Sequence, residues 1–159
     1  MADYVIDMLN RPILCYWVTR EGKAFASPNA SIFGPKVMTI NELAGSGGDA
    51  MPLFFCQRGL GKLVGKRTWG GLNGIYDFPV LMDGGSFTSP RMAIFSPTSE
   101  WEVENEGVAP DIEIEMTPKL VIEGHDPQLE KAIEIVLTEL EVGRQVKPSR
   151  PISAHRASG

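Results

Sequence analysis

The stretch from Ile40 to Phe55 reads INELAGSGGDAMPLFF and separates two segments of different character. Before it, Lys36–Ile40 is short, apolar and β-prone, which predicts a buried strand. After it, apolar side chains predict a short helix that ends near Gly59. Pro52 fits the first turn of that helix, where its missing N–H costs nothing. The sequence therefore predicts a small-residue turn between the carboxyl end of a strand and the amino end of a helix.

Ser46 carries the only hydroxyl of this turn. Glycines let the backbone turn sharply, and the first N–H groups of a helix lack partners within the helix, so they can stabilise a developing oxyanion near Ser46. The run Gly45-Ser46-Gly47-Gly48 loosely matches the G-x-S-x-G pattern of a nucleophile elbow. Two other interpretations stay open, a plain glycine-rich turn and a phosphate cradle.

Length and composition fit one globular domain with a core. The chain has 159 residues, 43% of them hydrophobic and 22% charged, with a net charge of −5. This charge gives no reason to expect nucleic acid as a partner. The sequence has no apolar run of the ~20 residues that span a membrane and no basic start of a signal peptide, so we expect no membrane partner and a cytoplasmic location.

The two thiols, Cys15 and Cys56, have no metal-ligand spacing and lie among apolar residues, so we expect both to be buried and reduced. Cys56 is a poor candidate nucleophile because no histidine lies near it in sequence. We expect no metal and no organic cofactor.

Other segments carry local signals for an α/β layered fold. We expect a helix over 2–9, strands over 13–18 and 61–68 with a turn near 20–23 leading to a further strand, and short strands within 78–97 around a turn at 83–85. Asp126 as cap and Pro127 as first residue start the clearest helix. One face of this helix is apolar, formed by Leu129, Ala132, Ile133, Val136, Leu137 and Leu140.

Five glycine-bearing motifs occur in a characteristic order: GPKV with INE, GSGGD, GKRTWGG, VENEGVAPD and GHDPQL. In this order and spacing they resemble the tail-specific (C-terminal processing) serine peptidases, and most closely the tricorn-type branch. The resemblance implies a crotonase-like (ClpP-like) β/α layered spiral, here as a partial domain. Residues 1–142 would be the C-terminal part of the peptidase catalytic domain, and 143–159 a disordered basic tail.

The resemblance also implies roles for single residues. Ser46 would be the nucleophile and the N–H of Gly47 one oxyanion donor. Three glycines, Gly45, Gly70 and Gly71, would bind substrate. Glu104, within Val103-Glu104-Asn105, would be the acidic member of a Ser-His-Ser-Glu tetrad and would polarise the histidine through a second serine. The alternative for Glu104 is a solvated strand carboxylate.

The general base is the missing member. The processing-peptidase branch places a lysine where this chain has Gly71, and Lys66 lies earlier in the strand. In the tricorn-type branch the histidine and its serine lie far upstream, whereas His125 and His155 fall outside the family's catalytic motifs. We therefore expect an upstream segment to carry the histidine and the isolated chain to be inactive. The resemblance further implies a peptide substrate and a homo-oligomer.

Two other functions compete with the peptidase. The first is a non-catalytic peptide-binding or assembly module that adds a peptide at a sheet edge. The second is an acyl-CoA site, since crotonase-like folds host other acyl chemistry and fold alone does not fix function. Against the second, no basic cluster flanks the Ser46 loop.

Overall fold

The computed structural model describes residues 2–76, 79–143, 148–149 and 151. The helices and strands, in chain order, are α1 (Ala2–Leu9), β1 (Cys15–Val18), β2 (Ala24–Ser27), β3 (Val37–Ile40), α2 (Gly47–Gln57), β4 (Lys62–Gly65), β5 (Ile112–Glu113), α3 (Pro118–Ile122) and α4 (Pro127–Val142). The described part of the chain is thus of mixed α/β class.

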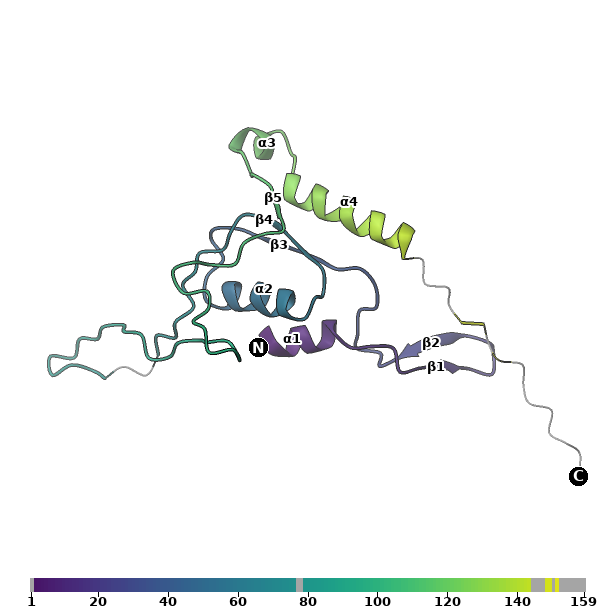
Figure 1. Ribbon diagram of the computed structural model, residues 1–159, viewed down its shortest axis with the longest axis horizontal. Coiled ribbons are helices and arrows are strands. Elements are labelled where there is room, and N and C mark those ends of the chain that lie inside the picture. Colours follow the sequence, from purple (N-terminus) through teal and green to yellow (C-terminus); the bar gives the residue numbers. More distant parts are fainter. Residues whose placement is uncertain (1, 77–78, 144–147, 150, 152–159) are drawn as a thin grey trace, which may run out of the picture.

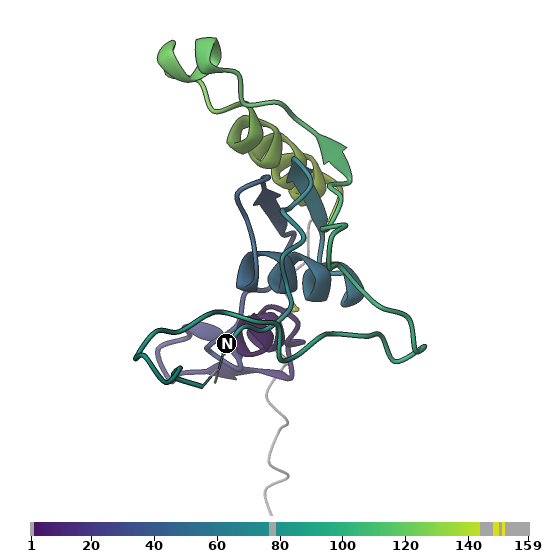
Figure 2. The same cartoon turned by 90° about the vertical axis from the view of Figure 1, so that its left-hand side faces the viewer.

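A small parallel sheet lies at the centre of the layers. Its strand order is β3-β4-β5, and both pairs are parallel. Strand β3 pairs with β4 from Val37↔Lys62 to Ile40↔Gly65. Figure 1 shows α4 on one side of this sheet and α2 on the other, with α1 beyond α2, and Figure 2 shows the same order of layers from the side. The β3–α2–β4 unit therefore places the start of α2 at the carboxyl end of β3.

The buried core fills the space between the sheet and the helices α1 and α2. It consists of Ile6, Ile40, Phe55 and Leu63, with partly buried apolar residues around them. Burying such side chains is the main favourable term in folding, at about 1.5–3 kcal/mol for each fully buried one. The predicted strand over 36–40 is confirmed, but Ile40 is its only fully buried residue. This core anchors β3 and α2, the two elements that flank Ser46.

The hairpin of β1 and β2 lies to one side of the layered body (Figure 1). Its antiparallel register runs from Cys15↔Ser27 to Val18↔Ala24, and the connecting turn lies where the sequence predicts it. All residues of β1 are exposed. The expectation that Cys15 is buried is therefore wrong, and Cys56, near the end of α2, is exposed as well. Apolar neighbours in sequence therefore do not predict the burial of these thiols.

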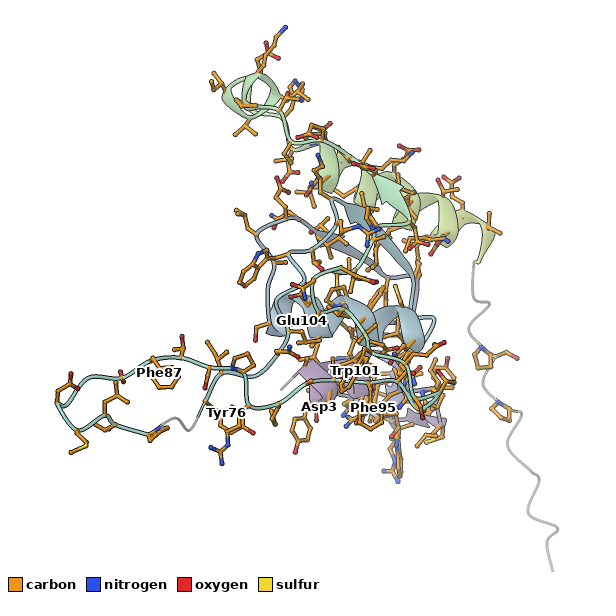
Figure 3. The ribbon with its side chains drawn as sticks, turned by 60° about the vertical axis from the view of Figure 1, so that its left-hand side comes forward. Asp3, Tyr76, Phe87, Phe95, Trp101 and Glu104 are labelled. Atoms are coloured by element: carbon orange, nitrogen blue, oxygen red, sulfur yellow. The ribbon has the colours of Figure 1, made fainter. Side chains whose placement is uncertain are left out.

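On the other side an arm leaves the body between Gly74 and Phe95, and Figure 3 shows Tyr76 and Phe87 along it. The predicted turn is present, with the N–H of Gly85 donating to Asp83 Oδ1 at 2.9 Å. The predicted strands are absent from the described residues of the arm, which hold only the bridge Gly74↔Met92. The β-prone side chains find no neighbouring strand there, so no ladder extends.

Helix α4 begins as predicted. Asp126 Oδ1 accepts the N–H of Leu129 at 2.9 Å, and Pro127 is the first residue. Its predicted apolar face is only partly covered by β3 and β4: Ala132 is buried, whereas Leu129, Ile133, Leu137 and Leu140 are each about half exposed. No helix among the described residues is long and apolar enough to cross a membrane. The predicted tail over 143–159 lies almost wholly outside the described residues.

Candidate active site

Helix α2 starts directly after Ser46, earlier than the sequence indicated. Pro52 therefore lies inside the helix, and its predicted place in the first turn is wrong. Tertiary contacts outweigh local propensity here: the Pro52 ring is fully buried, and the residue one turn before it is Gly48, which has no side chain to crowd the ring. The consequence is that the first residue of the helix, Gly47, directly follows Ser46.

Ser46 adopts a strained backbone conformation, with φ 53° and ψ −108°. A positive φ is uncommon for a residue other than glycine, and such outliers gather at active sites. The same strain at a strand-to-helix turn defines the nucleophile elbow. Ser46 therefore shares a strained backbone with the serine of a nucleophile elbow, and its role as a nucleophile stays a prediction.

The Ser46 side chain is available for chemistry. It occupies the N-cap position of α2 but makes no capping hydrogen bond, and the residue is exposed. The N–H of Gly47 also has no acceptor among the residues that the structure describes, whereas the N–H of Gly48 donates to the carbonyl of Gly45 at 2.8 Å. An uncapped serine hydroxyl and a free amide donor therefore lie on adjacent residues, while the roles of nucleophile and oxyanion donor stay predictions.

A loop from Trp69 to Asn73 lies against this turn. The N–H of Ser46 donates to the carbonyl of Gly71 at 3.0 Å, and the N–H of Trp69 donates to the carbonyl of Ala44 at 2.8 Å. The Trp69 indole covers Gly45 and Gly71 so closely that a Cβ on either would come within 2.5 Å of the ring. The absence of side chains on these two glycines is what lets the indole pack there.

Two carboxylates hold this loop through successive amides. Asp49, which is fully buried, accepts the N–H groups of Gly70 at 2.9 Å and Gly71 at 3.1 Å. Glu104 Oε2 accepts the next two N–H groups, of Leu72 and Asn73, each at 2.8 Å. Glu104 is thus not a freely solvated strand carboxylate. It is fixed beside the loop that contacts Ser46.

The backbone around Glu104 is itself strained. Val103 and Asn105 have φ angles of 71° and 63°, although Val103 is β-branched and buried. The N–H of Asn105 donates to the carbonyl of Gly70 at 2.7 Å, which ties this turn to the loop. Close by in sequence, the Asn73 side-chain oxygen is buried without a hydrogen-bond partner among the described residues. Glu104 Oε1 likewise accepts no hydrogen bond from the described part of the chain.

The glycines that the sequence predicts to bind substrate lie close together, but the backbone groups of Gly70 and Gly71 are already hydrogen-bonded within the protein. Gly70 and Gly71 donate to Asp49, and their carbonyls accept from Asn105 and Ser46. Gly70 is buried, and a Cβ there would lie 2.5 Å from the Gly107 nitrogen. Substrate binding by Gly45, Gly70 and Gly71 stays a prediction.

The described residues offer no general base to Ser46. Lys66 pairs with Glu115, and this hydrogen bond raises the pKa of the lysine above its usual value. A lysine base needs the opposite shift. His125 lies just before α4, and its Nδ1 is 3.1 Å from Glu130 Oε1. Among the described residues no cluster of histidine, cysteine or acidic side chains could hold a metal ion.

Cys56 is a poor nucleophile for a second reason. Partial burial and, after it, the negative charge of Asp111 raise the pKa of its thiol. A raised pKa lowers the fraction of thiolate, which is the reactive form.

A pocket of about 440 Å³ lies near the residues that lead into the Ser46 turn. Its lining includes Asn41, Glu42 and Leu43, together with Lys66 from the end of β4 and Asp126 from the α4 cap. Ser46 itself is not part of this lining.

The residue that sequence reasoning missed is Asp49. The sequence did contain a signal for it: Asp49 is the first residue of DAMPLFF, and the other residues of this run are apolar. If such a run is buried, its carboxylate must find hydrogen-bond partners. Placing α2 too late in the sequence hid this signal, since Asp49 then fell in an exposed turn.

Comparison with known proteins identifies the family of this chain. Residues 12–114 match Peptidase family S41. The chain is 38% identical over 151 residues to the Tricorn protease of Thermoplasma acidophilum, covering 95% of this chain and 14% of that protein. It is 37% identical over 151 residues to Tricorn protease homolog 1 of Streptomyces coelicolor, covering 94% of this chain and 14% of that protein.

Solved structures agree with this assignment. The crystal structure of the tricorn protease matches with a TM-score of 0.82 at 38% identity, over 88% of this chain and 14% of that one. The photosystem II D1 C-terminal processing protease matches in fold, with a TM-score of 0.50 at 20% identity, over 85% of this chain and 34% of that one.

A strained serine between a parallel strand and a helix is the arrangement of serine hydrolases of the elbow type. The chain belongs to Peptidase family S41. It is homologous to a region of tricorn protease and spans about one seventh of the length of these relatives.

Proposed function

We propose that this chain carries the nucleophile of a serine-type peptidase, and that peptide bonds are cleaved through an acyl-enzyme on Ser46. The observation that carries the proposal is the Ser46 turn: a strained, exposed serine whose hydroxyl caps nothing, next to the free N–H of Gly47. Membership of Peptidase family S41 supports the reaction class.

In this proposal the general base takes the proton of Ser46 Oγ as that oxygen attacks the carbonyl carbon of the peptide, and the Gly47 N–H donates a hydrogen bond to the carbonyl oxygen, on which negative charge develops. The C–N bond then breaks, the base gives the proton to the leaving amine, and water releases the acyl group from Ser46. A preorganised donor such as the Gly47 N–H contributes on the order of 3–4 kcal/mol to lowering the barrier. A crotonase-like arrangement of the complete domain would place a second donor opposite the first.

The general base comes, in this proposal, from a segment outside the described residues that carries a histidine. Two features support this. Lys66 and His125 are engaged with Glu115 and Glu130. Glu104, in contrast, is held rigidly by the Leu72 and Asn73 amides and keeps Oε1 free for a donor such as the second serine of a tetrad. Glu104 would then polarise the histidine through that serine.

The substrate, the assembly and the location are further parts of the proposal. Two relatives are named as tricorn protease and its homolog, which supports peptides as substrates here. Self-association and a cytoplasmic location stay predictions from the sequence.

The test is covalent labelling of the full-length protein with a fluorophosphonate probe. We expect labelling of the parent and none of Ser46→Ala. The matched control is Ser99→Ala, because Ser99 is also exposed and also has a positive φ, of 69°, but lies away from a helix start. Ser99→Ala should label like the parent, and a parent that is not labelled would exclude the peptidase proposal.

A second candidate is a peptide-binding module without catalysis. It is favoured by one observation, the lack of a free base among the described residues. In that case the parent would bind unfolded peptides with an affinity that Ser46→Ala leaves unchanged, and neither protein would release cleaved peptide.

A further inference from the structure

Asp49 is the most deeply buried charged residue near Ser46. Its exposed fraction is 0%, and it lies in the first turn of α2. Leaving a carboxylate unpaired in such a place is costly, so buried carboxylates are fully hydrogen-bonded. Both oxygens of Asp49 indeed have partners, the N–H groups of Gly70 and Gly71.

These bonds belong to a closed ring that includes the candidate nucleophile. The backbone N–H of Asp49 donates to the Ser46 carbonyl at 3.0 Å. The Asp49 side chain accepts the Gly71 N–H at 3.1 Å. The Gly71 carbonyl in turn accepts the Ser46 N–H at 3.0 Å. The C=O of Ser46 is therefore bonded to the backbone of Asp49, and its N–H is bonded to Gly71, which the Asp49 side chain holds.

The ring explains how the strain at Ser46 is maintained. A backbone in a sparsely populated conformation persists only where its surroundings over-determine it. With the Asp49 bonds removed, the Gly70–Gly71 backbone could shift, and the Ser46 N–H would lose its fixed acceptor. Ser46 could then relax toward an ordinary conformation, which would rotate its hydroxyl away from the Gly47 N–H.

We propose that Asp49 is a positioning residue for the peptidase reaction, which holds Ser46 in its strained, reactive conformation through the Gly70–Gly71 loop. This inference rests on the proposed function of Ser46. It assigns Asp49 no contact with the substrate, so its removal should slow acylation and leave substrate binding nearly unchanged.

The test compares Asp49→Asn with the parent in the full-length protein. The amide keeps the shape of the carboxylate, but its NH₂ group cannot accept an amide proton, so one of the two bonds to the Gly70 and Gly71 amides is lost. We expect fluorophosphonate labelling of Ser46 and kcat for peptide cleavage to fall about 10- to 100-fold with KM within about twofold, the size expected for a displaced reacting group. Hydrogen exchange of the peptide that contains the Gly70–Gly71 loop should become faster.

The matched control is Asp111→Asn. Asp111 is also a carboxylate that accepts a backbone N–H, from Leu63 at 2.8 Å, but it joins the sheet strands and not the Ser46 loop. This variant should lower the unfolding temperature without changing kcat. A merely structural role of Asp49 would give the same pattern in Asp49→Asn, and that result would overturn the inference.

A second variant keeps the inference testable. If Asp49→Asn does not fold, Asp49→Glu is tested, which keeps the charge, and slowed labelling again supports the inference. Wild-type labelling in either folded variant, or failure of both to fold, would overturn it. The proposed function fails separately, when the parent itself is not labelled or when Ser46→Ala still is.

Discussion

Ser46 combines a backbone conformation with positive φ and a side-chain hydroxyl. Glycine would adopt this conformation without strain but would lack the hydroxyl. The φ of 53° and ψ of −108° at Ser46 match the first central position of a type II′ turn, where glycine is preferred. Serine there costs on the order of 1–3 kcal/mol in backbone strain. The chain keeps the hydroxyl at the expense of stability, which is the pattern expected of a functional residue.

This strain makes a prediction about stability. Ser46→Gly should raise the free energy of unfolding by about 1 kcal/mol while abolishing the reaction, because glycine adopts this conformation without a steric penalty. Urea unfolding of the two proteins measures the difference. Ser31→Gly is the control, since Ser31 has a negative φ and should lose stability slightly. A less stable Ser46→Gly would contradict the strain argument.

The sequence could predict Ser46 but not the contacts that hold it. The serine is the single hydroxyl in a glycine-rich turn, a local signal. The Asp49 and Glu104 bonds join residues 21 to 32 positions apart, and no local pattern encodes such pairings. The late placement of α2 has the same origin, because two glycines and Pro52 disfavour a helix locally and only the buried contacts of Pro52 and Phe55 stabilise one.

At the scale of elements, α4 follows its sequence signals closely, so its cap offers a clean test. Asp126→Ala should lower the free energy of unfolding by about 1 kcal/mol, because the Leu129 N–H loses its acceptor. Thr117→Ala, which removes the weaker cap of α3 at 3.4 Å, should cost less. Circular dichroism during thermal unfolding measures both. Equal losses would show that the cap geometry does not matter.

Asp111 predicts how the sheet responds to pH. The Leu63 N–H, followed by Lys62, lowers the pKa of this carboxyl in the folded protein. A depressed pKa gives stability that is present above the unfolded pKa of about 4 and is lost as the pH falls through the lower, folded value. Asp111→Asn should therefore be less stable at pH 7, with the difference shrinking below about pH 4. A difference that stays constant down to pH 2 would contradict this.

At the scale of the whole molecule, α4 leaves an apolar surface uncovered. Leu129, Ile133, Leu137 and Leu140 are each about half exposed, and apolar patches of this kind mark contact surfaces. We expect the chain expressed alone to self-associate, and Ile133→Glu with Leu137→Glu to reduce this. Light scattering against concentration measures it, with Glu141→Gln on the same helix as control. A parent whose molar mass stays that of the monomer at all concentrations would show that this apolar surface does not drive self-association.

The arm between Gly74 and Phe95 has a consequence for the continuity of the chain. Ser46 and Asp49 precede its tip at Asp83–Gly85, whereas Glu104, β5 and α4 follow it. The two halves are joined by the β4–β5 pairing, by Glu104 on the Leu72 and Asn73 amides, and by α4 on β3 and β4. A single cut at the tip would therefore leave a nicked molecule whose pieces stay associated, and two separately produced fragments could complement each other to rebuild the site.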